Sequence, residues 1–223
     1  MKSWCIGTPS ARFVAKMEDV LSVYHRPYNP SRPVVCVDEA SKELHGTPAG
    51  VLPIEPGQPV RVDYEYERLG KRNIFLAAEP LVGRRHLRVT DRRTTRDFAS
   101  FLRFLVEEAY PDVDVIVLVT DNLNTHSPAC LYECFDPDQA HRIAQKIEWH
   151  YTPEHGSWLN MAEIELSILS RQCLNQRIAD PAILEQQAKV WEQTRNKSNS
   201  KIDWQFTAAD ARIKLKRLYP IIS

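Results

Sequence analysis

Two apolar segments of this sequence each end on an aspartate. Residues 32–38 read RPVVCVD and residues 114–121 read DVIVLVTD, so both have the composition of buried strands that end on Asp38 and Asp121. A carboxylate in such a place is partly desolvated, which is unfavourable unless a cation lies beside it. An aspartate at a strand end can also cap the following helix, so each residue taken alone has a structural explanation as well.

A third segment, residues 155–165, enters a helix that carries Glu163 and Glu165. Helical periodicity does not choose between these two glutamates, because they lie beyond opposite edges of the apolar stripe of the helix. Three carboxylates brought together repel one another, and a divalent cation bound through oxygen is the usual solution. The residues alone therefore predict a metal-dependent phosphoryl-transfer site that acts on nucleic acid. Two cations would activate the attacking oxygen and stabilise the leaving oxygen.

These acids are far apart in the sequence, so the fold must assemble them. The spacing of the early strands indicates antiparallel neighbours, whereas the wholly apolar segment before Asp121 is typical of a central strand covered on both faces. The expected fold is an α/β mixed sheet, with antiparallel strands followed by parallel-type strands, flanked by helices. Strands are predicted over 34–38, 60–66, 73–79, 84–90, 114–120 and 146–151, with an irregular connection over 45–60. Helices are predicted over 11–24, 94–110, 158–174 and 181–196, with short helices in 126–145, interrupted by Pro137, and a terminal segment over 204–219.

Charge and cysteine usage narrow the class of protein. The 29 basic and 29 acidic residues give no net charge, which argues against a free-standing DNA-binding domain of high affinity. Arginines crowd within residues 84–103, and basic residues gather again within 212–217, so local patches exist that can follow a phosphate backbone or simply be solvated helix faces. No apolar run predicts a membrane span or a secretory signal. Five cysteines without a C-x-x-C pair indicate reduced thiols in a cytoplasm, with a metal role for Cys130 and Cys134 as a minor alternative.

Longer motifs surround two of the acids. Residues 121–126 (DNLNTH) and 151–163 (YTPEHGSWLNMAE) together resemble the catalytic core of mariner-type bacterial insertion-sequence transposases, which belong to the DDE group and have a ribonuclease-H-like fold. Asn160 to Glu163 matches the Asn-x-x-Glu motif of that family, whose glutamate is the third metal ligand, so the resemblance favours Glu163 over Glu165. Asp38 and Asp121 match the two aspartates. The resemblance continues through residues 4–6, 17–21 and 204–212, and so covers nearly the whole chain.

The resemblance implies a catalytic and metal-binding set of Asp38, Asp121 and Glu163, with two Mg²⁺ ions for which Mn²⁺ substitutes. It implies cleavage of DNA at insertion-sequence ends and strand transfer into target DNA, on the bacterial nucleoid in the cytoplasm. Expected partners are transposon-end and target DNA, a second copy of the chain, and an upstream helix-turn-helix polypeptide, because no helix-turn-helix pattern precedes the first aspartate. The expected division is a helical lead-in over 1–31, the DDE catalytic domain over 32–200 and a tail over 201–223.

Two other functions stay open at this point. A ribonuclease-H-like nuclease that only cuts would share the metal site, and a non-catalytic subunit or inhibitor of a full-length transposase would lack end recognition. His126 and His155 lie next to the acidic motifs and either contact phosphate or the attacking water, or are structural histidines. Asn124 is expected to orient the loop after the second strand, and Trp158 is expected in the core and not as a platform for base stacking.

Overall fold

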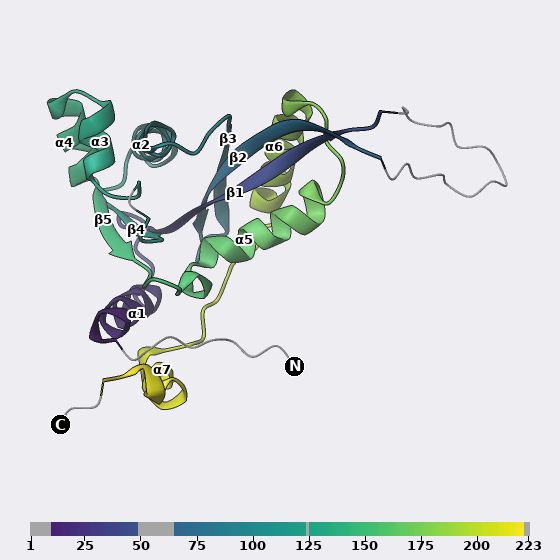
Figure 1. Ribbon diagram of the computed structural model, residues 1–223. Helices are drawn as coiled ribbons and strands as arrows, with labels where there is room; N and C mark the ends of the chain where they lie inside the picture. The colour runs from purple at the N-terminus through teal and green to yellow at the C-terminus, as the bar shows by residue number, and fades with distance from the viewer. Residues whose placement is uncertain (1–9, 49–64, 124, 221–223) are drawn as a thin grey trace.

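A five-stranded mixed sheet forms the centre of the computed structural model, which describes residues 10–48, 65–123 and 125–220 (Figure 1). The strand order is β3-β2-β1-β4-β5, in which β3, β2 and β1 pair antiparallel, and β4 pairs parallel with both β1 and β5. The predicted mixed sheet is confirmed. The strands are β1 (Val34–Gly46), β2 (Glu67–Glu79), β3 (Arg84–Thr90), β4 (Ile116–Thr120) and β5 (Ile147–Tyr151).

The first strand is much longer than predicted. β1 continues past residue 38 to Gly46 and pairs with β2 from Cys36 opposite Ala78 to Gly46 opposite Glu67. Its second half is polar and carries no strand pattern, but the ladder with β2 satisfies its backbone groups. The strand predicted over 60–66 falls largely outside the described residues, and β2 begins only at Glu67.

The helices follow the predicted order, and two of the predicted helices are divided by turns. The helix predicted over 94–110 divides into α2 and a π-helical turn, and the one predicted over 158–174 divides into a 3-10 turn, α5 and a second π-helical turn. Pro137 begins α4 at a position where its missing N–H costs nothing. No helix in the described ranges is long and apolar enough to cross a membrane. The helices are α1 (Ala11–Tyr24), α2 (Thr95–Phe104), α3 (Ala129–Cys134), α4 (Pro137–Gln145), α5 (Met161–Leu169), α6 (Pro181–Lys197) and α7 (Ala208–Lys214), with turns at Leu105–Ala109, Ser157–Leu159, Ser170–Leu174 and Lys216–Leu218.

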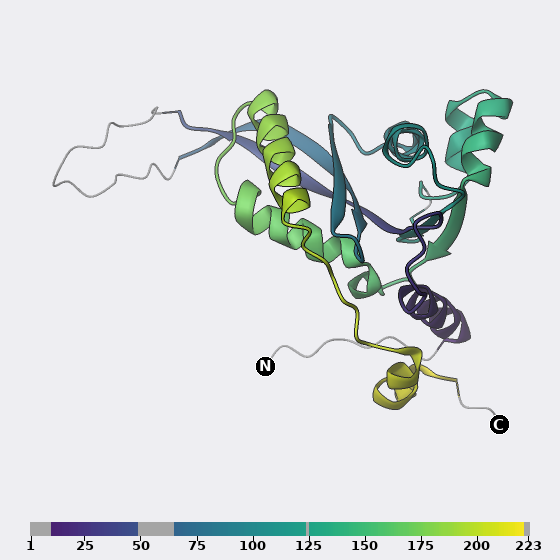
Figure 2. The ribbon, with the colours of Figure 1, turned by 180° about the vertical axis from the view of Figure 1, so that it is seen from behind.

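Two hydrophobic clusters cover opposite faces of the sheet. Figure 1 shows α2, α3 and α4 grouped above β4 and β5, with α1 below, and Figure 2 shows α5 next to α6. In β1, Cys36 belongs to the cluster with α1 and α5, whereas Val35 and Val37 belong to the cluster with α2, α3 and α4. Because side chains alternate along a strand, Asp38 continues on the α5 side and Glu39 on the α2 side. The alternation therefore separates two adjacent acids at the end of the buried part of β1.

Candidate functional site

Asp38 and Asp121 lie at the same edge of the sheet. β1 and β4 run parallel, with Cys36 opposite Val119, so the two aspartates are each two residues beyond a matched pair. Asp121 follows the carboxyl end of β4, and Asp38 lies inside β1 at the same level, just beyond the part of β1 that pairs with β4. The carboxyl ends of parallel strands are where α/β sheets commonly bind ligands. Glu163 lies in the first turn of α5 and is half-buried.

Asn160 ties the start of α5 to the end of β1. Its side-chain amide donates hydrogen bonds to the carbonyl oxygen of Val37 at 2.9 Å and to Oδ2 of Asp38 at 3.4 Å. The side-chain oxygen Oδ1 of Asn160 accepts a hydrogen bond from the backbone N–H of Ala162 at 3.1 Å, so Asn160 is also the N-cap of the helix. One buried side chain thus sets the distance between β1 and the helix that carries Glu163. The sequence motif included Asn160, but its spacing did not reveal this positioning role.

The Asp38 carboxyl lies among other acids. Burial raises its pKa to about 7, and the carboxylates of Glu39, Asp121 and Glu163 add to the rise. The backbone N–H of Glu39 donates to Asp38 Oδ1 at 2.8 Å, and this hydrogen bond lowers the pKa. Within the described ranges, neither Asp38 nor Glu163 has an ion pair with a basic side chain. The unfavourable energy of a partly buried negative charge is therefore not relieved by the protein itself.

Glu165 has a different environment, although it lies only two residues from Glu163. It is fully buried, and its Oε1 accepts from Nη2 of Arg85 at 2.6 Å and from Nη2 of Arg195 at 2.9 Å. Arg85 is itself 1% exposed. The network joins α5 to β3 and α6, so the Glu165 carboxylate is already paired with two guanidinium groups, on elements other than those that carry the aspartates.

The side chain of His126 is buried between Asp121 and Glu39. Its Nδ1 lies within hydrogen-bonding distance of Asp121 Oδ1, and also 3.3 Å from the Thr120 hydroxyl oxygen. Its Nε2 lies 3.4 Å from Oε2 of Glu39, and its ring stacks on Phe98 with the centroids 4.1 Å apart. With 2% of its side chain exposed, His126 is held by the protein and does not face open solvent. No motif predicted Glu39 as the second partner of His126. Only the alternation of side chains along β1 indicates that Glu39 lies on the α2 side of the sheet, where His126 lies.

The loop between β5 and α5 carries exposed groups. His155 is exposed and has a φ of 61°, in the left-handed region that is uncommon for residues other than glycine. Trp158 is 42% exposed, with its ring edge-on to Phe206 at 6.1 Å, so the prediction that it belongs to the core is wrong. The apolar stripe that included it begins at Leu159 instead, because residues 157–159 form a 3-10 turn before α5 starts. Asn124 lies outside the described residues.

The donor set fits a hard divalent cation by its chemistry. Carboxylate oxygens suit Mg²⁺, which usually takes one or two of them together with water and phosphate oxygens. The buried and uncompensated charge around Asp38 is the environment that such a cation would relieve. In the described part of the chain, no three His, Cys, Asp or Glu side chains are already gathered as ligands of a metal ion. Cys130 and Cys134 are free thiols.

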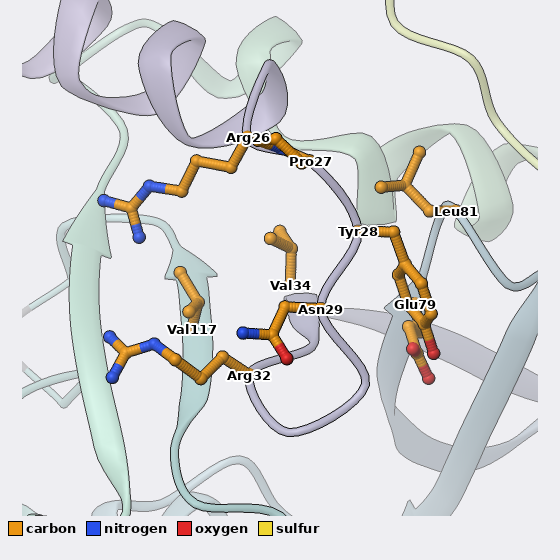
Figure 3. Close-up of a pocket in the computed structure, with 9 residues that line it drawn as sticks. All are labelled: Arg26, Pro27, Tyr28, Asn29, Arg32, Val34, Glu79, Leu81 and Val117. Atoms are coloured by element: carbon orange, nitrogen blue, oxygen red, sulfur yellow. The ribbon is translucent and has the colours of Figure 1, made fainter.

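A pocket of about 250 Å³ lies elsewhere, near the starts of β1 and β4 (Figure 3). Arg26 and Arg32, from the segment after α1, extend toward β5, where both guanidinium groups pair with Glu148, the first at 2.7 Å. This pocket is at the opposite end of the parallel strands from the acids, and its two arginines share the single carboxylate of Glu148. It is lined by Arg26, Pro27, Tyr28, Asn29, Arg32, Val34, Glu79, Leu81 and Val117.

Comparisons with known proteins agree with this geometry. The family model described as DDE superfamily endonuclease matches residues 33–184. The fold is similar to the Mos1 mariner paired end complex with Mn (TM-score 0.56, 15% identity, 90% of this chain and 62% of that chain). It is also similar to the Mos1 transposase paired-end complex with left transposon end (TM-score 0.53, 15% identity, 92% and 67%) and to the Mos1 paired end complex with Mg (TM-score 0.53, 16% identity, 98% and 64%).

At such identities the structural likeness concerns the fold alone, and the chain spans 62% of the length of the first of these proteins. No curated protein matches the sequence. The family model, however, covers well over half of the chain, from β1 to the first turn of α6. The predicted membership of the DDE group and the predicted ribonuclease-H-like fold are confirmed, and the chain belongs to the DDE superfamily endonucleases, of which it carries the catalytic domain.

Proposed function

We propose that this chain is the catalytic domain of a mariner-type insertion-sequence transposase. It cuts DNA at the ends of the element and joins the freed 3′-hydroxyl groups to target DNA. The observation that carries the proposal is that the Asp121 and Glu163 carboxylates, from two other elements, lie near enough to Asp38 to raise its pKa, while neither Asp38 nor Glu163 has a basic partner among the described residues. Such an uncompensated set of acids in a DDE endonuclease suits the binding of cations at a phosphodiester.

Asp38 and Asp121 would hold two Mg²⁺ ions, with Glu163 completing the second position and Mn²⁺ substituting for Mg²⁺. When bound, the two cations activate the attacking oxygen and stabilise the leaving oxygen. The contribution of the chain is to place these carboxylates, because phosphoryl transfer depends on positioning and on neutralised charge. Asn160 fixes the start of α5 against Val37 and Asp38, so it sets the place of Glu163 before the substrate arrives.

The partners follow from the same proposal. The substrates are transposon-end and target DNA, which the Mos1 structures support by the transposon end that one of them contains. An upstream helix-turn-helix polypeptide would recognise the ends, and a homodimer would hold two ends together, on the bacterial nucleoid in the cytoplasm. The proposed division into a lead-in (1–31), a catalytic domain (32–200) and a tail (201–223) is supported by the family match to 33–184.

A strand-transfer assay tests the proposal. The chain is incubated with Mg²⁺ or Mn²⁺, a supercoiled plasmid and a duplex oligonucleotide with a free 3′-hydroxyl, and nicked and joined products are separated on a gel. We expect both products from the wild type, and a loss of both by more than about a thousand-fold, or about 4 kcal/mol of activation free energy, in Asp38→Asn, Asp121→Asn and Glu163→Gln. Glu133→Gln on α3 is the matched control, because this acid is exposed and lies away from the cluster.

Each alternative function has its own outcome in this assay. Nicking without a joined product would identify a nuclease that only cuts, and the transposase assignment would be rejected. No product, combined with equal Mn²⁺ affinity in the wild type and in an Asp38→Ala, Asp121→Ala double variant, would identify a non-catalytic subunit.

A further inference from the structure

We propose that His126 is a positioning residue that holds the Asp121 carboxylate in the orientation from which it binds a cation. This inference rests on the proposed function, because it takes Asp121 as a ligand. His126 does not touch the substrate or the reacting atoms in this role. It acts through Asp121 alone.

The hydrogen bonds of Asp121 leave one of its oxygens free. Nδ1 of His126 donates to Oδ1, because an ionised carboxylate only accepts, and the backbone N–H of Leu123 donates to the same oxygen at 3.4 Å. Oδ2 accepts no hydrogen bond from any described residue. One oxygen is thus anchored to the protein and the other is available, as expected of a metal-binding carboxylate supported by outer hydrogen bonds.

The imidazole ring is fixed on its other sides. Phe98 of α2 stacks on it at 4.1 Å between centroids, and the Thr120 hydroxyl oxygen lies 3.3 Å from Nδ1. A ring held between a strand and a helix cannot follow movements of the acid, so the acid takes its orientation from the ring. The imidazole is 2% exposed, whereas the Asp121 side chain is 27% exposed, so the anchored carboxylate stays open to solvent.

The contact between His126 and Glu39 differs from the His126–Asp121 contact, because it is not a hydrogen bond. Nε2 of His126 lies 3.4 Å from Glu39 Oε2, yet this buried oxygen has no hydrogen-bond partner in the described structure. Oε1 of Glu39 lies 3.6 Å from Nη1 of Arg93, whose side chain is 60% exposed. The Glu39 contact is therefore electrostatic and undirected, whereas the Asp121 contact is a directed hydrogen bond. For this reason we assign the positioning role to Nδ1 and not to Nε2.

Two conservative variants separate the two nitrogens. The amide nitrogen of asparagine lies near the place of Nδ1, so His126→Asn keeps a donor toward Asp121, while His126→Gln reaches toward Glu39 and loses it. Mn²⁺ binding to the full chain is measured by electron paramagnetic resonance, which does not require activity. We expect His126→Ala and His126→Gln to weaken Mn²⁺ binding about 10- to 100-fold, and His126→Asn to stay within about threefold of the wild type.

Controls distinguish this inference from the proposed function. His141→Ala on α4 should leave Mn²⁺ binding unchanged, because that exposed ring contacts only the Tyr132 hydroxyl, at 3.3 Å, among the described residues. Thermal unfolding of each variant shows whether the fold is kept. If the wild type and Asp121→Asn bind Mn²⁺ equally, the proposed function fails.

If Asp121→Asn loses binding while all three His126 variants keep it, only the positioning role is overturned. Retention in His126→Gln with loss in His126→Asn would overturn it too, since Nε2 would then be the acting atom. An equal loss in all three folded variants would show that ring packing on Phe98 matters and not the Nδ1 donor, and would also reject the proposal.

Discussion

Glu163 and Glu165 lie on the same helix, two residues apart, and have opposite environments. Glu165 is fully buried and accepts hydrogen bonds from Arg85 and Arg195, whereas Glu163 has no basic partner among the described residues and adds to the negative charge around Asp38. Two positions on a helix differ by about 200° of rotation, so anchoring one glutamate turns the other to the opposite side. The Arg85–Glu165–Arg195 network therefore orients α5, and the orientation brings Glu163 to the aspartates.

The two glutamates illustrate the difference between a carboxylate that is paired within the fold and one that is available to bind a ligand. A buried carboxylate with two guanidinium partners has its charge compensated within the protein, and removal of one partner leaves an uncompensated buried charge. Carboxylates that neighbour one another without such partners keep an unfavourable energy as long as they are ionised, which a bound cation or a proton relieves. Four predictions test this difference.

Glu165→Gln gives the largest expected effect on stability. The substitution leaves Arg85 charged and almost fully buried without its carboxylate partner, while its guanidinium keeps hydrogen bonds to the carbonyl oxygens of Gly83 and Ser200, so we expect a loss of about 3–5 kcal/mol in the free energy of unfolding. Glu163→Gln is the matched control and should change stability by less than about 0.5 kcal/mol. Urea unfolding followed by circular dichroism measures both. An equal loss in the two variants would contradict the distinction between the two glutamates.

Removal of both partners should cost less than the sum of the single losses. In the double variant Arg85→Met, Glu165→Leu no buried charge of the pair stays unpaired, so we expect a coupling free energy of about 2 kcal/mol in a double-mutant cycle. The cycle requires the unfolding free energies of the wild type, both single variants and the double variant. Additive losses would show that the two side chains do not act as a unit.

Asp38 should make the metal-free protein less stable as the pH rises. Its pKa is about 7 in the folded chain and 3.8 in its ordinary state, so the folded protein binds this proton more tightly than the unfolded one. The contribution of protonated Asp38 to the free energy of unfolding is fully present below pH 4 and is lost as the pH rises through 7. We expect a total of about 1–2 kcal/mol, because solvent screens a half-buried group.

Urea unfolding between pH 4 and 8 in the presence of a chelator measures this effect. Asp38→Asn should be more stable than the wild type at pH 8 and equal to it at pH 4. Glu192, whose pKa burial also raises to about 7, contributes with the same sign in both proteins, so the difference between them isolates Asp38. A difference that does not depend on pH would contradict the prediction.

Arg93→Ala gives the smallest expected effect. Its pair with Glu39 spans 3.6 Å, and 60% of the arginine side chain is exposed, so water already screens the interaction. We expect a loss below about 1 kcal/mol that disappears in 0.5 M salt, in contrast to the buried pair of Arg85. A loss as large as that of Glu165→Gln would mean that burial does not explain the difference between the two pairs.

Much of the fold could be predicted from the pattern of apolar residues. The strand that ends just before Asp121, the start of the strand that contains Asp38, the order of the helices and the mixed sheet were correct, because burial on both faces leaves a continuous apolar run and a helix leaves a periodic one. The polar half of β1 and the exposure of Trp158 could not be predicted in this way. The first depends on a partner strand, and the second depends on where a short turn ends and α5 begins.

The sequence by itself determined which acids follow the apolar segments, and its motifs identified the family that the chain belongs to. Only the tertiary structure decided which glutamate of α5 lies near Asp38, and that His126 contacts Asp121 on one side and Glu39 on the other. The physical reason is that local patterns record burial and backbone preference, which act along the chain. The environment of a charge depends on groups from distant elements, such as Arg85 on β3 and Arg195 on α6, and these meet only when the sheet and its helices are packed.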